Sequence, residues 1–227
     1  MTFSEKFIQN FIQDNRWTYL TSGLLNTIII TIFSLIIGVI LGFLVAIISS
    51  TYTKNGKLKI LNAICQVYLT IFRGTPVMVQ LLIMFYVIMS SSNNKLLVAI
   101  ITFGINSGAY VAEIVRSGIM SIDNGQFEAG RSLGFNYVQT MRYIIIPQAF
   151  KNVMPALMNE LIVLLKETSV CGYIGLMDLT KGGDIIRSRT YEAFLPLMAV
   201  AIIYLVMVVG LSALAKRVER RLRIGDK

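Results

Sequence analysis

The sequence has no histidine and only two cysteines among its 227 residues. It therefore lacks the side chain most often used as a catalytic base and as a zinc ligand. Cys65 and Cys171 are far apart in the sequence, and no other ligand residues cluster beside them, which argues against a metal site and against a disulfide framework. We expect no metal site and no catalytic residue in this chain.

Charged residues are also scarce, at 15% of the chain, whereas 55% of the residues are hydrophobic. A soluble domain of this size could not bury so much apolar surface in one core. No linker or polar block of domain size interrupts the hydrophobic segments, so we expect one all-α membrane domain over residues 1–227. The formal charge is +9, but the basic residues lie in short loops and a tail without interleaved aromatic residues, which argues against nucleic-acid binding.

The hydrophobic segments predict five transmembrane helices. Residues 23–48 carry no charge, and a helix of this length measures about 39 Å, more than the roughly 30 Å of a hydrocarbon core. The other four are expected at about 60–89, 96–118, 144–170 and 193–215. The second contains Gly74-Thr75-Pro76 and is predicted to break near its middle. The fourth is the most polar, with Lys151, Glu160, Lys166, Glu167, Pro147 and Pro155.

The distribution of basic residues predicts the orientation. Segments 52–59, 116–142 and 216–227 are basic, whereas 90–95 and 172–192 are short or balanced in charge. Five spans place all three basic segments on the cytoplasmic side, as the positive-inside rule requires. We expect the N-terminus outside and the C-terminus in the cytoplasm. With four spans, the basic tail would lie outside.

Small residues repeat along the first predicted span at Gly38, Gly42 and Ala46. Because this spacing places them on one helix stripe, another backbone can approach closely. The stripe could pack within the chain or against another subunit.

The cytoplasmic loop over about 121–143 contains the signals of a short helix. Asp123 or Asn124 can cap its start, Gly134 can end it in a left-handed conformation, and Asn136 can cap a following helix. An isolated helix of two to three turns is marginal in water and needs a surface to pack on. That surface is either this chain's own bundle or a groove in a partner protein.

The same loop resembles a known motif. Glu128-Ala129-Gly130, then Gly134, then Ile144, Ile146 and Pro147 have the spacing of the EAA loop of bacterial ATP-binding cassette (ABC) importer permeases. In that loop Glu-Ala-Ala is followed by Gly and then by Ile-x-Leu-Pro. Gly130 replaces the third residue and Ile146 the leucine, and both substitutions keep a small or apolar side chain.

The rest of the chain resembles the histidine/glutamine-type permeases, which import polar amino acids. The resemblance covers about residues 23–215, with matching motifs in the same order. They are Phe72 to Gln80, Ala109 to Arg116, Ser121-Ile122 with Gly125-Gln126, Ser132 to Gly134, Pro147 to Ala149 and Lys166 to Ser169.

The resemblance implies a multi-pass permease of the bacterial inner or plasma membrane that pairs with a second copy or a paralogue. An external binding protein or domain would deliver the amino acid, and two cytoplasmic ATPase subunits would drive transport. The expected ATPase-coupling residues are Glu128, Ala129, Gly130, Leu133 and Gly134. The chain has no Gly-x-x-x-x-Gly-Lys-Ser/Thr phosphate loop, so ATP-Mg and its hydrolysis are assigned to the partner, and this chain is expected to bind no cofactor and to be no enzyme.

Five residues are candidates for substrate binding: Arg73, Thr75, Asn106, Asn159 and Glu160. Helix rise places the break from Arg73 to Pro76, together with Asn106 and Glu160, near the bilayer midplane. Ionisable residues at that depth are functional candidates, and broken helices form sites there. Arg73 could hold a substrate carboxylate, or it could pair with an internal acid or with the carbonyl groups at the break.

Glu160 could receive the cationic end of arginine, lysine or histidine, and Asn159-Glu160 resembles the basic amino acid members of the family. Its alternative is an internal ion pair with Lys151 or Arg73. Other cargoes such as glutamine or cystine remain open. A different class, a secondary transporter with Arg73, Glu113 and Glu160 along an ion pathway, is disfavoured because the chain has no inverted repeat.

A polar stripe is expected on the third span, where Asn106, Tyr110, Glu113 and Ser117 share one helix face. The stripe could line the transport path or bond to neighbouring helices.

Overall fold

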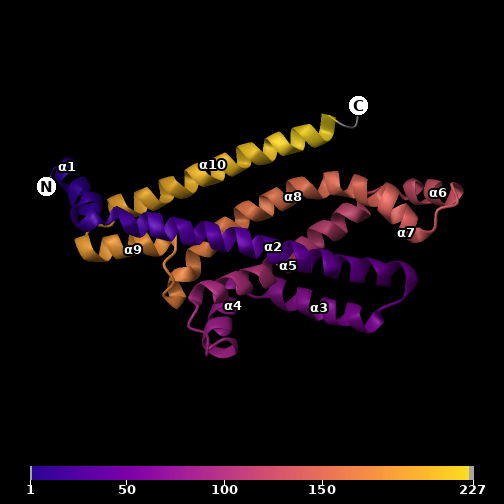
Figure 1. Cartoon of the computed structure of the whole chain (residues 1–227), viewed down its shortest axis with the longest axis horizontal. Helices are drawn as coiled ribbons and strands as arrows, with labels where there is room; N and C mark the ends of the chain where they lie inside the picture. The colour runs from indigo at the N-terminus through magenta and orange to yellow at the C-terminus, as the bar shows by residue number, and fades with distance from the viewer. Residues whose placement is uncertain (1, 225–227) are drawn as a thin grey trace.

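The computed structural model describes residues 2–224, which form helices and no strand. The long helices lie roughly along one axis, with the N-terminus at one end of the molecule and α6 and α7 at the other (Figure 1). The helices are α1 (Phe3–Phe7), η1 (Ile8–Ile12), η2 (Gln13–Asn15), α2 (Trp17–Asn55), α3 (Lys59–Gly74), α4 (Val77–Ile83), η3 (Met84–Ile88), α5 (Lys95–Met120), α6 (Asn124–Ser132), α7 (Tyr137–Thr140), η4 (Met141–Ile145), α8 (Ile146–Glu167), η5 (Thr168–Ile174), α9 (Leu179–Thr190) and α10 (Phe194–Ile224). The last three residues of the basic tail lie outside the described part.

Three helices are long and apolar enough to cross a membrane: Trp17–Thr53, Lys95–Met120 and Phe194–Leu222. They coincide with the first, third and fifth predicted spans. The bent pair Lys59–Gly74 and Val77–Ile88 raises the number to four if it counts as one span. α8 covers most of the fourth predicted span, but it is not among these helices, since its sequence contains charged residues, uncharged polar residues and two prolines.

The second predicted span breaks at the expected place but bends sharply there. Its two halves are bent by 109°, so α4 does not continue in the direction of α3. The sequence predicts one interrupted crossing, whereas the structure has a helix of 16 residues followed by a segment that turns away from it. Gly74-Thr75-Pro76 predicts the break but carries no information about its angle.

The small-residue stripe of α2 packs within the chain, against α5. A Cβ atom on Gly38 would lie 2.9 Å from Ser107, and one on Gly42 would lie 2.5 Å from Val111. Ala46 is 1% exposed in a cluster with Val111. The two backbones approach too closely for larger side chains, so the intrachain interpretation of the stripe is confirmed.

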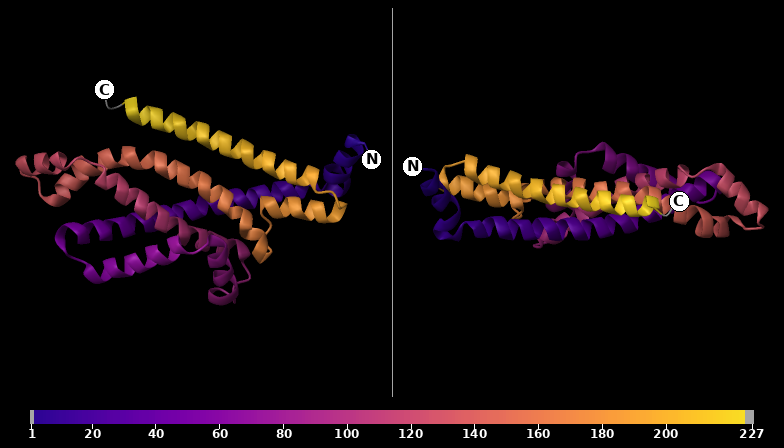
Figure 2. Two further views of the ribbon diagram at one scale, coloured as in Figure 1. Left: turned by 180° about the vertical axis from the view of Figure 1, so that it is seen from behind. Right: turned by 90° about the horizontal axis from the view of Figure 1, so that it is seen from above.

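α10 is the least enclosed of the long apolar helices. Only 11% of its most apolar window is buried inside the protein, against 67% for α5. It runs along one side of the bundle (Figure 2). Much of its apolar surface is therefore left for lipid or for another subunit.

Helix α9 lies in the segment 172–192, which the sequence predicts to be a connecting loop. Asp178 caps its first turn by accepting a hydrogen bond from the Thr180 amide at 2.9 Å. Gly182 has no room for a side chain, because a Cβ atom there would touch the Tyr19 carbonyl oxygen of α2. The pair Gly182-Gly183, which suggests a loop in isolation, permits close packing of α9 against α2 at Gly182 and against Val200 of α10 at Gly183.

Candidate functional site

The break between α3 and α4 is held together by Gln80. Its Nε2 atom donates to the carbonyl oxygens of Phe72 and Thr75 at 3.0 Å each and to Thr75 Oγ1 at 2.9 Å. Pro76 has no amide hydrogen, and the bend leaves these carbonyl groups without their helical donors. Gln80, which is 6% exposed, replaces those donors.

Asn106 of α5 forms hydrogen bonds to the same break between α3 and α4. Its Nδ2 atom donates to Gln80 Oε1 at 2.8 Å and to the Phe72 carbonyl oxygen at 3.2 Å. The residue is only 2% exposed, and its side-chain amide is engaged in hydrogen bonds within the protein. Thr75 lies at the exposed side of the bend, and its hydroxyl donates to the Ile71 carbonyl oxygen at 2.8 Å.

Arg73 pairs with an internal acid, which is one of the two alternatives for it. That acid is Glu113 of α5, with 3.4 Å between Arg73 Nη1 and Glu113 Oε2. Arg116 lies on the other oxygen of Glu113 at 3.6 Å, and the Arg73 guanidinium is 6.0 Å from the centre of the Tyr110 ring. The Arg73 and Glu113 side chains are 42% and 34% exposed, so we expect the pair to contribute little stability.

Glu160 is buried, at 8% exposure, and its carboxylate accepts a hydrogen bond from the Ser107 hydroxyl at 2.8 Å. Lys151 precedes it by nine residues in α8, which places the two about 13 Å apart along the axis and on opposite helix faces. Arg73 pairs with Glu113. Neither base that the sequence suggests for Glu160 is therefore placed as its partner, whereas a neutral hydroxyl is.

Adjacent residues of α5 connect the two parts of the candidate site. Asn106 bonds to the bend between α3 and α4, and Ser107 bonds to Glu160 of α8. Asn159, next to Glu160, is exposed. The structure thus gathers the predicted residues around the middle of α5, with Arg73, Thr75 and Asn159 exposed and Asn106 and Glu160 buried.

Gln80 holds the bend, although it is not among the site residues that the sequence predicts. It closes the matching stretch Phe72 to Gln80, one turn beyond Pro76, where a polar side chain can reach back to the break. In the sequence, its role is indicated only by its being a single glutamine within an apolar helix.

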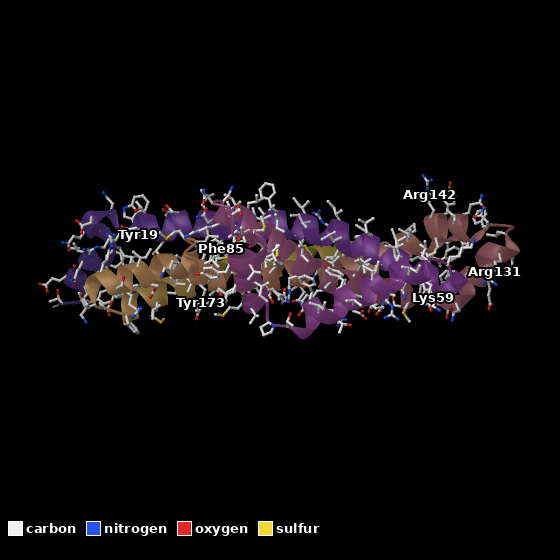
Figure 3. All side chains as sticks on the ribbon, turned by 90° about the horizontal axis from the view of Figure 1, so that it is seen from below. Tyr19, Lys59, Phe85, Arg131, Arg142 and Tyr173 are labelled. Atoms are coloured by element: carbon white, nitrogen blue, oxygen red, sulfur yellow. The ribbon has the colours of Figure 1, made fainter. Side chains whose placement is uncertain are left out.

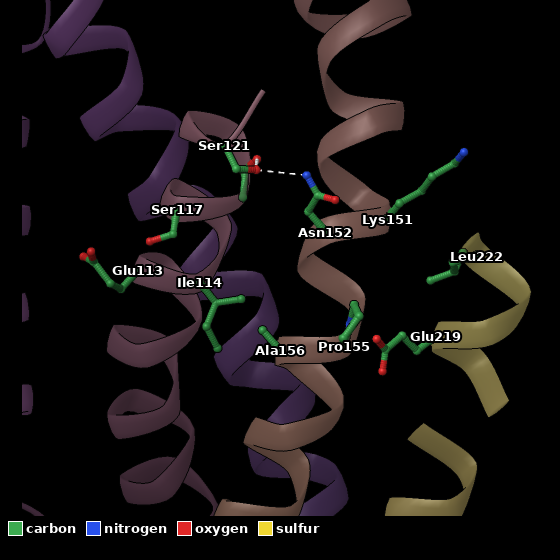
Figure 4. A pocket seen from close by; sticks show the side chains of 11 residues that line it. Glu113, Ile114, Ser117, Ser121, Lys151, Asn152, Pro155, Ala156, Glu219 and Leu222 are labelled. Carbon is green, nitrogen blue, oxygen red and sulfur yellow. Dashed lines mark hydrogen bonds between the residues drawn. The ribbon is translucent and has the colours of Figure 1, made fainter. Parts of the chain in front are cut away.

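A cavity of about 620 Å³ lies between α5, α8 and the end of α10 (Figure 4). Glu113 and Ser117 line it from α5, and Lys151, Asn152 and Glu219 line it from α8 and α10. Asn152 donates to the Ser121 hydroxyl at 2.9 Å across its edge. On the polar stripe of α5, Asn106 and Glu113 therefore bond to other helices, while Glu113 and Ser117 also line the edge of the cavity.

The helix at the far end of the molecule has the ends that the sequence predicts. Asp123 accepts a hydrogen bond from the Gly125 amide at 2.6 Å, and Gly134 has a φ of 78°. Asn136 and Gln139 form a capping box at the start of α7. The local residue types are sufficient to define these ends.

One face of α6 is packed and the other is exposed. Phe127 is buried with Ile122, Ile145 and Ala149, and Gly130 lies directly against Thr140. Of the five residues expected to couple to an ATPase, Gly130 is buried, whereas Glu128, Ala129, Leu133 and Gly134 are exposed. Leu133, the residue that follows α6, is 71% exposed.

Comparison with known proteins identifies the family. Residues 38–224 match the model of the binding-protein-dependent transport system inner membrane component. The chain is 38% identical over 207 residues to the putative glutamine transport system permease protein GlnP of Rickettsia typhi, covering 90% of this chain and 93% of that protein. It is 36% identical to the arginine transport system permease protein ArtQ of Bacillus subtilis, covering 92% and 94%.

Solved structures agree with this assignment. A crystal structure of an amino acid ABC transporter with histidines matches with a TM-score of 0.84 and 41% identity, covering 93% of this chain and 98% of that one. An inward-facing structure of the MetNI methionine ABC transporter matches with a TM-score of 0.77 at 22% identity, which indicates a shared fold. The chain therefore belongs to the inner membrane component family of binding-protein-dependent transport systems, as the permease subunit of an amino acid ABC importer.

Proposed function

We propose that this permease crosses the bacterial cell membrane five times, with its N-terminus outside and its C-terminus in the cytoplasm. The spans are α2, α3 with its bent continuation, α5, α8 and α10. Lys59, Arg131 and Arg142 lie toward one end of the molecule and Tyr19 at the other (Figure 3). The positive-inside rule then assigns the basic end to the cytoplasm.

We further propose that α6 docks on a cytoplasmic ATPase subunit. Two permeases, identical or paralogous, would engage two ATPases, which hold ATP-Mg and hydrolyse it, while an external binding protein delivers the amino acid. The support is the exposed face of α6 with Leu133 at its end. An apolar side chain there is stabilised by entering a groove of a partner.

The cargo that we propose is a basic amino acid. The observation that supports this choice is Glu160, a buried carboxylate whose donor is the neutral Ser107 hydroxyl. A charge at this depth is costly unless a cation or a polar cavity compensates it. A cationic substrate side chain would supply that compensation, with Asn159, Thr75 and Arg73 on the exposed side of the same region.

Relatives carry names for both kinds of cargo, glutamine in Rickettsia typhi and arginine in Bacillus subtilis. Glutamine is therefore the second candidate. Cystine is chemically possible as a polar amino acid. A neutral substrate would leave Glu160 with Ser107 alone, which is why the buried acid favours arginine, lysine or histidine.

We propose that alternating access carries the substrate from this region to the cytoplasm. The cavity between α5, α8 and α10 has polar lining on the side assigned to the cytoplasm and would form part of the exit. Closure of the two ATPases would move α6 and, through the Gln126 to Gln148 hydrogen bond of 3.2 Å, the start of α8.

The substrate assignment is tested by Glu160→Gln in the complete transporter, reconstituted with its ATPase and binding protein. The amide keeps an acceptor for Ser107 but loses the charge. We expect uptake of arginine or lysine to fall at least tenfold and glutamine uptake to change little. An equal loss for all amino acids would show that Glu160 is structural.

Ser107→Ala is the matched control for that experiment. It removes the hydrogen bond to Glu160 but leaves the charge in place. We expect it to lower thermal stability while the preference for basic over neutral substrates remains. If it changes the preference as much as Glu160→Gln does, the hydrogen bond rather than the charge determines selectivity.

A further inference from the structure

A groove of about 410 Å³ runs between α2, α5 and the joined helices η4 and α8. Its floor is tightly packed, since Val115, Ala149 and Val153 are each 3% exposed. Its walls are exposed apolar side chains: Ile47 of α2 is 57% exposed, and Phe150 of α8 is 48% exposed. The groove therefore has a closed apolar base and an open side.

The groove changes in polarity from one end to the other. α2 runs toward the end of the molecule that carries α6, and α8 runs away from it (Figure 1). At the inner end Phe43 and Val153 belong to one apolar cluster. At the opposite end the lining includes Thr51, Tyr137 and Arg142. One end is thus hydrocarbon only, and the other is polar and positively charged.

The length of the groove matches one leaflet of a bilayer. Tyr137 and Val138 of α7 continue the lining beyond Arg142, and the part from Arg142 to Val153 covers eleven residues of η4 and α8, which corresponds to about 16 Å of helix rise. This is about half of the roughly 30 Å hydrocarbon core. Under the proposed orientation the groove begins at the cytoplasmic surface and ends near the middle of the membrane.

We propose that this groove binds one acyl chain of an anionic phospholipid of the cytoplasmic leaflet, with Arg142 contacting the lipid phosphate. The site goes beyond amino acid transport and rests only on the proposed orientation. An acyl chain fits the apolar floor and walls, and a guanidinium binds phosphate through two parallel hydrogen bonds. Arg142 is exposed at the mouth, and its guanidinium lies 5.7 Å from the Tyr143 ring centre.

The change in polarity along the groove favours a lipid over a protein segment as the occupant. An amphipathic helix from a partner would need an apolar strip along its whole contact, whereas this groove has a charged mouth and an apolar inner end. A lipid has the same asymmetry, and basic side chains near the cytoplasmic surface attract anionic headgroups. The combination of depth, polarity and charge specifies an inner-leaflet anionic lipid.

The test is native mass spectrometry of the permease in complex with its ATPase, titrated with phosphatidylglycerol or with phosphatidylcholine of the same acyl chains. We expect the wild type to retain phosphatidylglycerol preferentially. Arg142→Gln should weaken phosphatidylglycerol binding about fivefold, the effect of one basic residue near the membrane surface. Arg142→Lys should retain most of the binding.

Two matched controls separate this site from general lipid association. Lys59→Gln removes an exposed basic residue that does not line the groove, and it should leave lipid retention unchanged. Ile47→Trp fills the groove and should displace the lipid, whereas Ile40→Trp, on the same helix with the same 57% exposure but outside the groove, should not.

Three results would overturn the proposal: equal retention of both lipids, equal loss of lipid in Arg142→Gln and Lys59→Gln, or unchanged lipid binding in Ile47→Trp.

A photoreactive residue at position 47 tests independently which molecule occupies the groove. Crosslinking to lipid in membranes supports the site. Crosslinking to a second permease or to the ATPase would show that a protein covers the groove.

Discussion

Asn106 of α5 donates its side-chain amide to Gln80 of α4 across 2.8 Å, and both side chains also donate to the Phe72 carbonyl oxygen at the end of α3. Two buried amides from different helices therefore satisfy one break in the chain. The bend of 109° is a built feature, fixed by polar contacts that replace the missing helical hydrogen bonds. It gives Thr75 and Arg73 defined positions at the exposed side of the bend.

The first prediction concerns this support. Gln80→Leu removes three donated hydrogen bonds and the acceptor of Asn106, which leaves the Thr75 carbonyl group without this donor and the Phe72 carbonyl group with Asn106. An unsatisfied buried polar group costs about 1–3 kcal/mol, so we expect a clear drop in the thermal unfolding temperature in detergent. Gln66→Leu, at an exposed position of α3, should have little effect. Equal stability of both variants would show that the amide of Gln80 does not hold the bend.

The second prediction concerns Gly130, which stands where the family motif has alanine. A Cβ atom at this position would lie 2.6 Å from Thr140 Cγ2 and 2.7 Å from its Oγ1. We expect Gly130→Ala to destabilise the packing of α6 on α7 by about 1–3 kcal/mol, as overpacking does. Limited proteolysis of the loop and thermal unfolding would measure the effect.

Thr140→Ala should largely rescue Gly130→Ala, because it removes Cγ2 and Oγ1, the two atoms closest to the new methyl group, and leaves the Thr140 Cβ atom at 3.2 Å. Gly210→Ala is the matched control, since a Cβ atom there meets nothing within 4 Å, and it should be neutral or slightly stabilising. A double variant as unstable as Gly130→Ala alone would mean that Thr140 is not the obstacle.

The parts of the fold that follow from local chemistry were predictable from the sequence. The charge-free segments predict α2 and α10, and the caps Asp123, Gly134 and Asn136 predict the ends of α6 and the start of α7. Each of these signals acts within a few residues. The family motifs likewise predict where the loop between α5 and α8 lies in the sequence.

Contacts between distant segments were not predictable. Arg73 pairs with Glu113, 40 residues away, rather than with Glu160. α9 depends on Gly182 fitting against Tyr19 of α2, a requirement that no local pattern expresses. The sequence likewise marks the bend after Gly74 without its direction, which Gln80 and Asn106 determine together.

The third prediction tests docking of α6. Gly134 has a φ of 78°, a conformation that asparagine and aspartate tolerate better than other side chains, so both replacements should preserve the local fold. Gly134→Asp adds a negative charge at the exposed end of α6. We expect it to reduce co-purification of the ATPase or to uncouple ATP hydrolysis from uptake, whereas Gly134→Asn should behave more like the wild type.

Leu133→Ser complements this pair, because Leu133 is 71% exposed and its loss removes apolar contact area without disturbing the core. It should weaken ATPase association and leave thermal unfolding of the isolated permease unchanged. Normal coupled uptake in both Gly134→Asp and Leu133→Ser would rule out the docking assignment.

The last prediction concerns Asp178, which lies between α8 and α10, outside the proposed spans. Burial raises the pKa of its carboxyl group to about 6, and among residues 2–224 its Oδ1 atom has no hydrogen-bond partner. Because the pKa of Asp178 in the folded protein lies above the usual value near 3.8, its protonation stabilises the fold at low pH, and this contribution is lost as the pH rises through about 6.

Thermal stability of the wild type should therefore fall between pH 5 and pH 7.5. Asp178→Asn, which still caps α9, should remove most of that dependence. Asp184 does not titrate in this interval, since Arg187 and Lys181 hold its pKa below the usual value. An unchanged pH profile in Asp178→Asn would show that another group causes it.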